Sequence, residues 1–166
     1  MPILVKEIKA SRLKSDALRL ELLSAMRKAG TQVKLDFEQT TKTWKRKPKF
    51  EMVISLTPPG PQLIVGTDDE IYRYVDEGTR PHIILPRRAK ALRFQSGYKA
   101  KTSPGVIGSG SGGSFGNVVF SQGVHHPGTQ ARDFEGAIKK KREKWFKQQM
   151  TNAMKKVAQA SGHAIA

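Results

Sequence analysis

Apolar side chains recur every three or four residues through the N-terminal part of the chain, and this spacing limits what the chain can fold into. On a helix these positions fall within one stripe about 100° wide, as on a helix that packs against a core. Ser15 and Asp16 form a suitable N-cap region, and Pro48 disfavours helix at the residue before it. Gly30 leaves the phase of the stripe unchanged. The pattern predicts one helix within residues 12–44, with an inner face made of Leu18, Leu22, Met26, Ala29, Val33, Phe37, Thr40 and Trp44.

Alternating apolar residues then predict short antiparallel strands. The strand segments are FEMVISLT (50–57), QLIVGT (62–67), IYRYVDEG (71–78), PHIILP (81–86), ALRF (91–94) and NVVFSQGV (117–124). The segment SPGVIGSGSGGSFG (103–116) is rich in glycine and serine, a composition that cannot bury enough apolar surface to order itself. We therefore expect it to be a flexible hairpin loop, or to become ordered only against a partner.

A second long helix is expected over residues 131–160. It carries two apolar stripes, rotated by roughly 100° from each other. The first contains Phe134, Ile138 and Trp145, and the second contains Phe146, Met150, Ala153, Met154 and Val157. Such a helix can bury one face in its own domain and offer the other to a neighbour. The fold class predicted is α+β, with one domain spanning residues 1–166 and a small antiparallel sheet (50–124) packed against the N-terminal and C-terminal helices.

Composition narrows the classes of protein that fit. The chain has no cysteine, which excludes disulfides, thiol catalysis and cysteine zinc sites and fits a reducing cytosol. No apolar window is long enough for a membrane span, and the first residues lack the apolar region of a secretory signal. The apolar fraction of 37% is low for a compact monomer and suggests parts covered by partners.

Positive charge is concentrated in the second half. The formal net charge is +16, and residues 84–166 carry 15 basic and 3 acidic side chains, against 15 and 11 in residues 1–83. A field of this size favours anionic partners such as nucleic acid or an acidic protein surface. The segment IKKKREKWFK (138–147) is the densest part, and its Lys139, Lys140, Lys141 and Arg142 are candidates for contact with DNA phosphates or an acidic surface.

The segment VHHPGTQARDF (124–134) raises the question of a metal or catalytic site. His125 and His126 are adjacent, so in a strand they point to opposite faces, and a site would need His82 and a carboxylate brought in by the fold. We interpret the segment as a structural turn, in which Pro127 and Gly128 redirect the chain and Thr129 caps the segment after it.

Two other patterns are weak signals. GSGSGGSFG lacks the Gly-Lys-Ser/Thr of a phosphate-binding loop and no helix follows it at once. The acids at 68–70 and 76–77 resemble a carboxylate metal centre only loosely, and at strand ends solvated acids are ordinary. The sequence therefore predicts no enzyme, no cofactor and no metal site.

The order of the segments is more specific than any one of them. A long amphipathic helix precedes VDEGT (75–79), HIILPRRAKALRF (82–94), a variable loop, HPGTQARDF (126–134) and a C-terminal helix. This order resembles the HK97 gp10-like family of tailed-bacteriophage neck and tail-completion proteins, over roughly residues 12–160. The Gly/Ser loop is longer than is usual there, and TWKRKPKF (43–50) replaces a link of small residues.

The resemblance implies a structural virion protein, assembled in the host bacterial cytoplasm as a ring subunit that terminates the tail or joins it to the head. Family rings are sixfold or twelvefold, and their partners are head-closure or adaptor proteins, tail-tube proteins and passing double-stranded DNA. Contacts between subunits are expected at Trp145, Phe146, Met150, Met154 and Val157. Contacts between rings are expected at Gly105, Gly108, Gly110, Gly112, Gly113 and Phe115. The alternative is a nucleic-acid-binding protein that uses the basic C-terminal helix.

Overall fold

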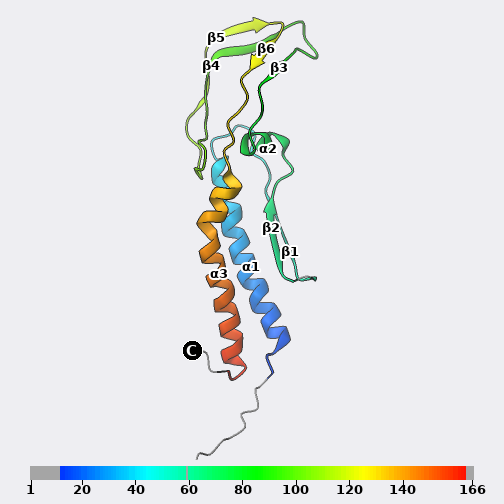
Figure 1. Ribbon diagram of the computed structural model, residues 1–166, viewed down its shortest axis with the longest axis vertical. Coiled ribbons are helices and arrows are strands. Elements are labelled where there is room, and N and C mark those ends of the chain that lie inside the picture. The colour runs from blue at the N-terminus through cyan, green and yellow to red at the C-terminus, as the bar shows by residue number, and fades with distance from the viewer. Residues whose placement is uncertain (1–11, 59, 164–166) are drawn as a thin grey trace, which may run out of the picture.

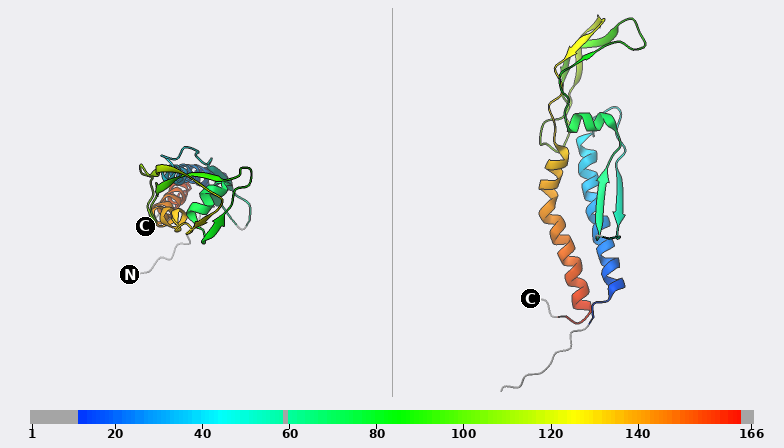
Figure 2. Two further views of the ribbon diagram at one scale, coloured as in Figure 1. Left: turned by 90° about the horizontal axis from the view of Figure 1, so that it is seen from above. Right: turned by 45° about the vertical axis from the view of Figure 1, so that its right-hand side comes forward.

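The computed structural model describes residues 12–58 and 60–163, and it has the predicted α+β class. Helix α1 (Ser15–Thr40) and helix α3 (Phe134–Ala160) lie side by side and antiparallel (Figure 1). The hairpin of β1 (Glu51–Ser55) and β2 (Gln62–Gly66) lies along α1. The short helix α2 (Glu70–Asp76) crosses the end of the helix pair, and beyond it an elongated β arm extends away from the helices (Figure 2).

Helix α1 buries the stripe that its sequence predicts, and it runs through Gly30 without a break. Met26, Ala29, Phe37 and Thr40 are all buried. The helix ends at Thr40, earlier than the predicted boundary at residue 44. Its end has a local cause, since the Thr40 hydroxyl donates to the carbonyl oxygen of Phe37 (2.6 Å) and competes with the helical pattern. At the other end the N-cap is Lys14, without a side-chain cap, so Ser15 and Asp16 do not cap the helix.

The β1–β2 hairpin packs against α1 through a close approach at Gly30. The two strands are antiparallel, with register from Glu51 opposite Gly66 to Ser55 opposite Gln62. A Cβ atom at Gly30 would collide with the side chains of Met52 and Leu63, one on each strand. Glycine is therefore accommodated inside this helix, in spite of its low helix propensity, because it lets the hairpin lie against the helix backbone.

Residues 71–78 were predicted to be a strand, and this prediction is wrong. They belong to α2 and its end. The Asp69 carboxylate caps the helix by accepting a hydrogen bond from the backbone N–H of Tyr72 (2.9 Å). The alternation of apolar residues misled the assignment, because Tyr72 and Val75 also stand one helical turn apart and both face the core.

The core lies where α1, α2 and α3 converge. It consists of Phe37, Phe50, Tyr72, Phe134 and Ile138, with Val33, Trp44, Val65, Val75 and Ile107 packed around them. Tyr72 is at its centre and contacts four other rings, with centroids 5.1 Å from Phe50, 5.6 Å from Phe134, 6.2 Å from Trp44 and 6.3 Å from Phe37. Rings at these separations add stabilisation beyond burial of their area.

The arm contains the other strands. β3 (His82–Ile84) pairs with β6 (Val124–His126), and β4 (Leu92–Lys99) pairs with β5 (Gly113–Ser121), both antiparallel. A register irregularity between Gln95 and Gly97 interrupts the second pair. Within the described residues the strands thus form three two-stranded sheets. Among these pairs, β1–β2 is the one that packs along a long helix.

The Gly/Ser segment does not behave as expected. Gly113–Gly116 lie in β5, and the preceding residues fold back onto the ends of the helices (Figure 1). The backbone N–H of Thr43 donates to the Ser109 hydroxyl (3.0 Å), the Thr43 hydroxyl donates to the carbonyl oxygen of Gly110 (2.8 Å), and Ile107 packs against the core. The expectation that this segment becomes ordered only against a partner is therefore wrong, because polar groups of its own domain satisfy its backbone.

The prediction that Pro127 and Gly128 form a turn is wrong. Val124, His125 and His126 form β6, and the pairing continues past Pro127 and Gly128 in the same antiparallel register, from His82 opposite His126 to Thr79 opposite Thr129. Thr129 does not cap α3; it forms a bridge with Thr79 through two backbone hydrogen bonds of 2.9 and 3.0 Å. The N-cap of α3 is Asp133, whose carboxylate accepts from the N–H of Gly136 (3.2 Å). The Asp76 carboxylate also caps this helix by accepting from the N–H of Phe134.

We predict that Gly128→Val destabilises the protein more than His125→Ala. Gly128 has φ of 90°, and a Cβ atom there would collide with the carbonyl oxygen of Thr79. Backbone strain of this kind costs about 1–3 kcal/mol, whereas an exposed substitution such as His125→Ala stays within about 0.5 kcal/mol. Chemical denaturation of both variants measures the difference, and equal midpoints would contradict the structural role of Gly128.

Candidate subunit interface

The molecule exposes more surface than a folded monomer of its size. Its accessible area is 12980 Å² at 18.4 kDa, whereas a compact monomer of that mass exposes about 8,200 Å². The excess is too large for the few residues outside 12–58 and 60–163 to supply. It arises because the arm and the far ends of the helices extend away from one small core (Figure 2).

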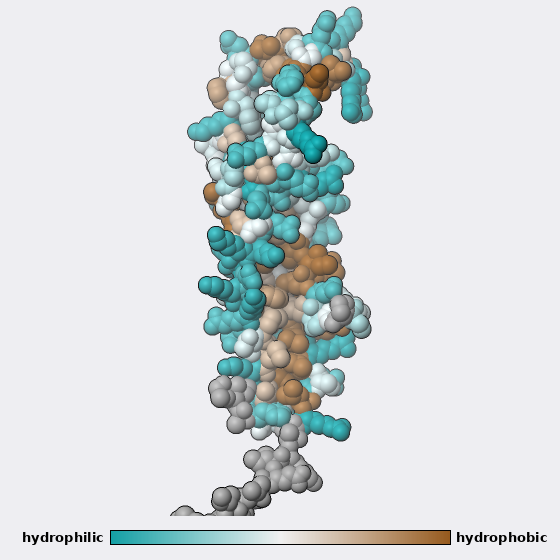
Figure 3. Space-filling view, viewed as in Figure 1, coloured by the Kyte–Doolittle hydropathy of each residue, from teal (hydrophilic) through white to brown (hydrophobic). Residues whose placement is uncertain are grey.

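The arm exposes apolar side chains on both faces of a two-stranded ribbon. Phe94 lies opposite Val119 on one face, and Arg93 lies opposite Phe120 on the other. Phe120 is 68% exposed, and Ile83 on the neighbouring strand β3 is 67% exposed. Figure 3 shows this hydrophobic surface at the top of the molecule, and more of it over the β1–β2 hairpin and along the helices beneath. A two-stranded ribbon without a covered face is marginally stable alone, so the arm is a surface suited to a partner.

The predicted subunit-contact residues of α3 occupy different environments. Val157 is buried (2% exposed) on the helix that packs along α1, so it belongs to the core of the subunit and the prediction of an intersubunit contact is wrong for it. Met154 is 56% exposed, and Trp145 and Met150 are half-buried. Phe146 lines an open apolar groove of about 750 Å³ between α3 and the β1–β2 hairpin. Four of the five predicted positions therefore remain accessible to a neighbour.

The residues predicted to contact the next ring lie in two parts of the Gly/Ser segment: the loop that folds back on the helices, and strand β5. Gly105, Gly108 and Gly110 lie in the loop that folds back on the helices, and Gly112 lies where an added Cβ atom would collide with the backbone of Lys99 and Ala100. Gly113 begins β5, and Phe115 in the same strand is 57% exposed. Among these positions Phe115 offers the largest apolar surface.

The basic helix is partly used inside the subunit. Arg142 donates from two nitrogens to both carboxylate oxygens of Asp36, and Lys141 donates to Asp36 Oδ1 (2.9 Å). Burial by itself raises the pKa of Asp36, but the hydrogen bonds and positive charges of Arg142 and Lys141 outweigh it and keep that pKa below 3.8. Lys141 and Arg142 thus fasten α3 to α1, and Lys139 and Lys140 are exposed.

The arm carries a second basic region, which no motif in the sequence marks. From Gly78 to Arg132 there are eight basic residues and no acidic one. Arg87, Arg88, Lys90 and Arg93 are all exposed near the far end of the arm, and no ion pair joins them to a carboxylate of the described chain. The absence of acidic residues from this part of the sequence is the signal that marks the region. The denser run of lysines in α3 drew the prediction of a basic surface to that helix instead.

The histidines and acids considered for a metal site make contacts that support the fold. The fold does bring His82 to His126, with stacked rings 5.0 Å apart, and His126 Nδ1 accepts from the N–H of Gly128 (3.1 Å). Within the described residues no three His, Asp or Glu side chains gather closely enough to hold a metal ion. Two of the five acids in the loosely carboxylate-like pattern are helix caps, since Asp69 caps α2 and Asp76 caps α3.

Comparisons of the chain with protein-family models, with curated proteins and with solved structures found no match. In the part of the chain that the structure describes, no helix is long and apolar enough to cross a membrane.

We predict that Asp36→Asn removes an acid-sensitive part of the stability. The folded pKa of Asp36 lies below its unfolded value, so its ionisation contributes stability at neutral pH that is lost as pH falls through the folded pKa. The side chains of Lys141 and Arg142 are 50% and 20% exposed, so loss of their hydrogen bonds to the charged Asp36 costs about 1.5–3 kcal/mol at pH 7. Urea denaturation at pH 7, 5, 4 and 3 should show a smaller fall in unfolding free energy for the variant than for the native chain.

Glu143→Gln is the matched control on the same helix, because Glu143 pairs with Lys147 (2.6 Å) at an exposed position. Its unfolding curves should overlay those of the native chain at neutral pH. Parallel pH profiles for the Asp36→Asn variant and the native chain would contradict the role assigned to the Asp36 ion pair.

Proposed function

We propose that the chain is a ring-forming structural subunit of a tailed-bacteriophage virion, at the neck or tail terminus, and that it has no enzymatic activity. The observation that carries the proposal is the β arm, a projecting ribbon with exposed apolar side chains on both faces. Such an arm gains stability when a neighbour covers it. The sequence order that resembles the HK97 gp10-like family supports the same role.

The shape of the subunit suits a head-to-tail contact. A ring requires two different surfaces on each subunit, one of which fits the other on the next copy. The arm supplies one projecting surface, while α3 and the β1–β2 hairpin supply a concave one in the groove that Phe146 lines. In a sixfold or twelvefold ring these surfaces would meet between copies. The remaining exposed faces would contact adaptor or head-closure proteins on one side and tail-tube proteins on the other.

The test is the mass of the purified protein by mass photometry, alone and with tail tubes, combined with negative-stain imaging. We expect closed rings of one stoichiometry that attach to tube ends. Phe120→Ser should weaken assembly by about 10-fold or more, because burial of a phenylalanine contributes about 1.5–3 kcal/mol. A strict monomer that never joins tubes would contradict the proposal.

Leu20→Ser is the matched control for that substitution. Leu20 and Phe120 are equally exposed, at 68%, but Leu20 lies on α1, near the end of the helix pair that is far from the arm (Figure 1). Both variants should retain the thermal stability and circular dichroism of the native subunit. Equal loss of assembly in both would show that the effect is general and is not caused by the arm.

The acid-free arm favours a second candidate function, in which the protein binds nucleic acid directly. Its cations, together with Lys139 and Lys140, would contact phosphates, and binding would weaken steeply with salt. A neck channel also passes double-stranded DNA, so the two functions are compatible.

We predict the effects of four lysine and arginine substitutions on that binding. If α3 contacts DNA, Lys139→Ala with Lys140→Ala should lower the salt slope of an electrophoretic shift by about 2, near 0.9 per phosphate contact. Adding Lys141→Ala and Arg142→Ala should weaken the shift further but also destabilise the subunit, because these two side chains hold Asp36. The same shift and slope with Lys139 and Lys140 replaced would exclude the α3 contact.

A further inference from the structure

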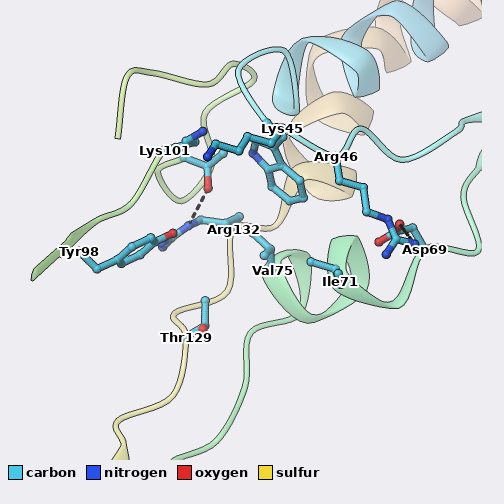
Figure 4. A pocket seen from close by; sticks show the side chains of 11 residues that line it. Lys45, Arg46, Asp69, Ile71, Val75, Tyr98, Lys101, Thr129 and Arg132 are labelled. Atoms are coloured by element: carbon cyan, nitrogen blue, oxygen red, sulfur yellow. Dashed lines mark hydrogen bonds and ion pairs between the residues drawn. The ribbon is translucent and has the colours of Figure 1, made fainter. Parts of the chain in front are cut away.

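A second cavity shares no lining residue with the groove. It has a volume of about 370 Å³ and is bounded by the segment after α1, by α2, by the end of β4 and by the segment before α3. Its aromatic and aliphatic walls come from Trp44, Ile71, Val75 and Tyr98, and its polar groups are mostly cationic. Figure 4 shows Tyr98 and Val75 on either side of Arg132.

Arg132 is unusual because it is buried without an anionic partner. Its residue is 9% exposed, and its Nε donates to the hydroxyl of Thr102 (3.2 Å). No carboxylate of the described chain forms an ion pair with it, and its two terminal nitrogens have no hydrogen bond to the described protein. Since no fully buried side-chain nitrogen among the described residues lacks a partner, these two nitrogens are accessible to solvent, and Arg132 is one of the residues that line the cavity.

The backbone around Arg132 holds the guanidinium in place. The N–H of Arg132 donates to the carbonyl oxygens of Val75 (3.2 Å) and Asp76 (2.9 Å), and its own carbonyl accepts from Gly105 (2.7 Å). A guanidinium presents its donors as a planar fork that binds two oxygens of a carboxylate or phosphate at once. A fork that is already fixed loses little conformational entropy when such a group binds.

Charges around the fork add to this preference. Lys45 and Lys101 approach from the same side of the cavity, above Arg132 in the view of Figure 4. Asp69 is the single acid among the described lining residues, and it is already engaged by Arg46 (3.7 Å) and by the N–H of Tyr72. An anion in the cavity would give the two accessible nitrogens of Arg132 the counter-charge that the described chain does not supply.

We propose that this cavity is an oxyanion-binding site in which the terminal nitrogens of Arg132 bind a carboxylate or phosphate group and Lys45 completes the charge around it. The ligand carries two or more oxygens on one centre, and its apolar part lies against Trp44 and Tyr98. The inference does not depend on ring formation, because neither Phe120 nor Phe146 lines this cavity.

The test uses the fluorescence of Trp44, which lines the cavity. Replacing the other tryptophan, as Trp145→Phe, leaves Trp44 as the reporter. The full chain is titrated with sodium phosphate and, separately, with sodium glutarate, against sodium chloride at equal ionic strength. We expect a saturable change in emission with at least one of the two oxyanions. Saturation by phosphate identifies a phosphoryl ligand, and saturation by glutarate alone identifies the carboxylate of an acidic side chain.

Variants separate the site from general salt effects. Arg132→Lys keeps the charge but loses the fork, so its half-saturation should rise about 10-fold. Lys45→Ala removes an exposed side chain and should raise the half-saturation about threefold without unfolding the protein, which keeps the test decisive if the Arg132→Lys variant does not fold. Lys140→Ala, on the outer face of α3, should bind like the native chain. Equal responses to chloride and both oxyanions, or unchanged half-saturation in the Arg132→Lys and Lys45→Ala variants, would overturn the proposal.

Discussion

The packing of Phe134 into the aromatic cluster is the interaction on which the rest of the structure depends. Phe134 is fully buried, and its ring stacks on Tyr72 at 5.6 Å. Phe134 is also the first residue of α3, and the Asp76 carboxylate of α2 accepts its N–H. One residue thus joins the core, the end of the short helix and the start of the long one. Loss of this contact would release α3 and the arm segment before it together.

Outside the junction of the aromatic core, the end of α2 and the start of α3, more of the protein surface is exposed to solvent. Away from the core, α1 and α3 continue as a pair held by a narrow seam and by the ion pairs of Asp36 with Lys141 and Arg142 and of Glu21 with Lys156. In the other direction the arm continues as thin ribbons. A subunit built in this way has a stable centre and two extended ends with exposed apolar side chains, which is the physical basis for the proposed ring.

Charge is arranged around the same junction. Acids are grouped on and beside α2, where Asp69 and Asp76 act as helix caps. Burial raises the pKa of Asp76, as do the negative charges of Glu135 and Asp133, although the N–H of Phe134 opposes the shift. The charged residues of the arm beyond α2 are all basic, and Arg132 at the base of the arm is buried without a carboxylate partner. The cation-rich arm and the unpaired arginine both point to anionic partners.

The amphipathic stripe of α1 and the requirement for glycine at position 128 could be predicted from the sequence, because helix periodicity and glycine's tolerance of positive φ are local properties. The secondary structure of residues 71–78 could not be predicted, because their alternation of apolar residues fits a strand and a short capped helix equally. The packing of Tyr72 in the core favours the helix, and that packing is visible only in the tertiary structure. The glycine-rich segment, likewise, is ordered by Thr43 and Arg132, which are distant in sequence.

The sequence by itself determined the α+β class, the inner face of α1 and the surplus of positive charge, because periodicity and composition carry that information. Only the tertiary structure decided which cations are free. It paired Lys141 and Arg142 with Asp36, left Lys139 and Lys140 in solvent and buried Arg132 beside an open cavity. The reason is physical: whether a charge is paired depends on which carboxylate the fold places within a few ångströms, and neighbours in space are not neighbours in sequence.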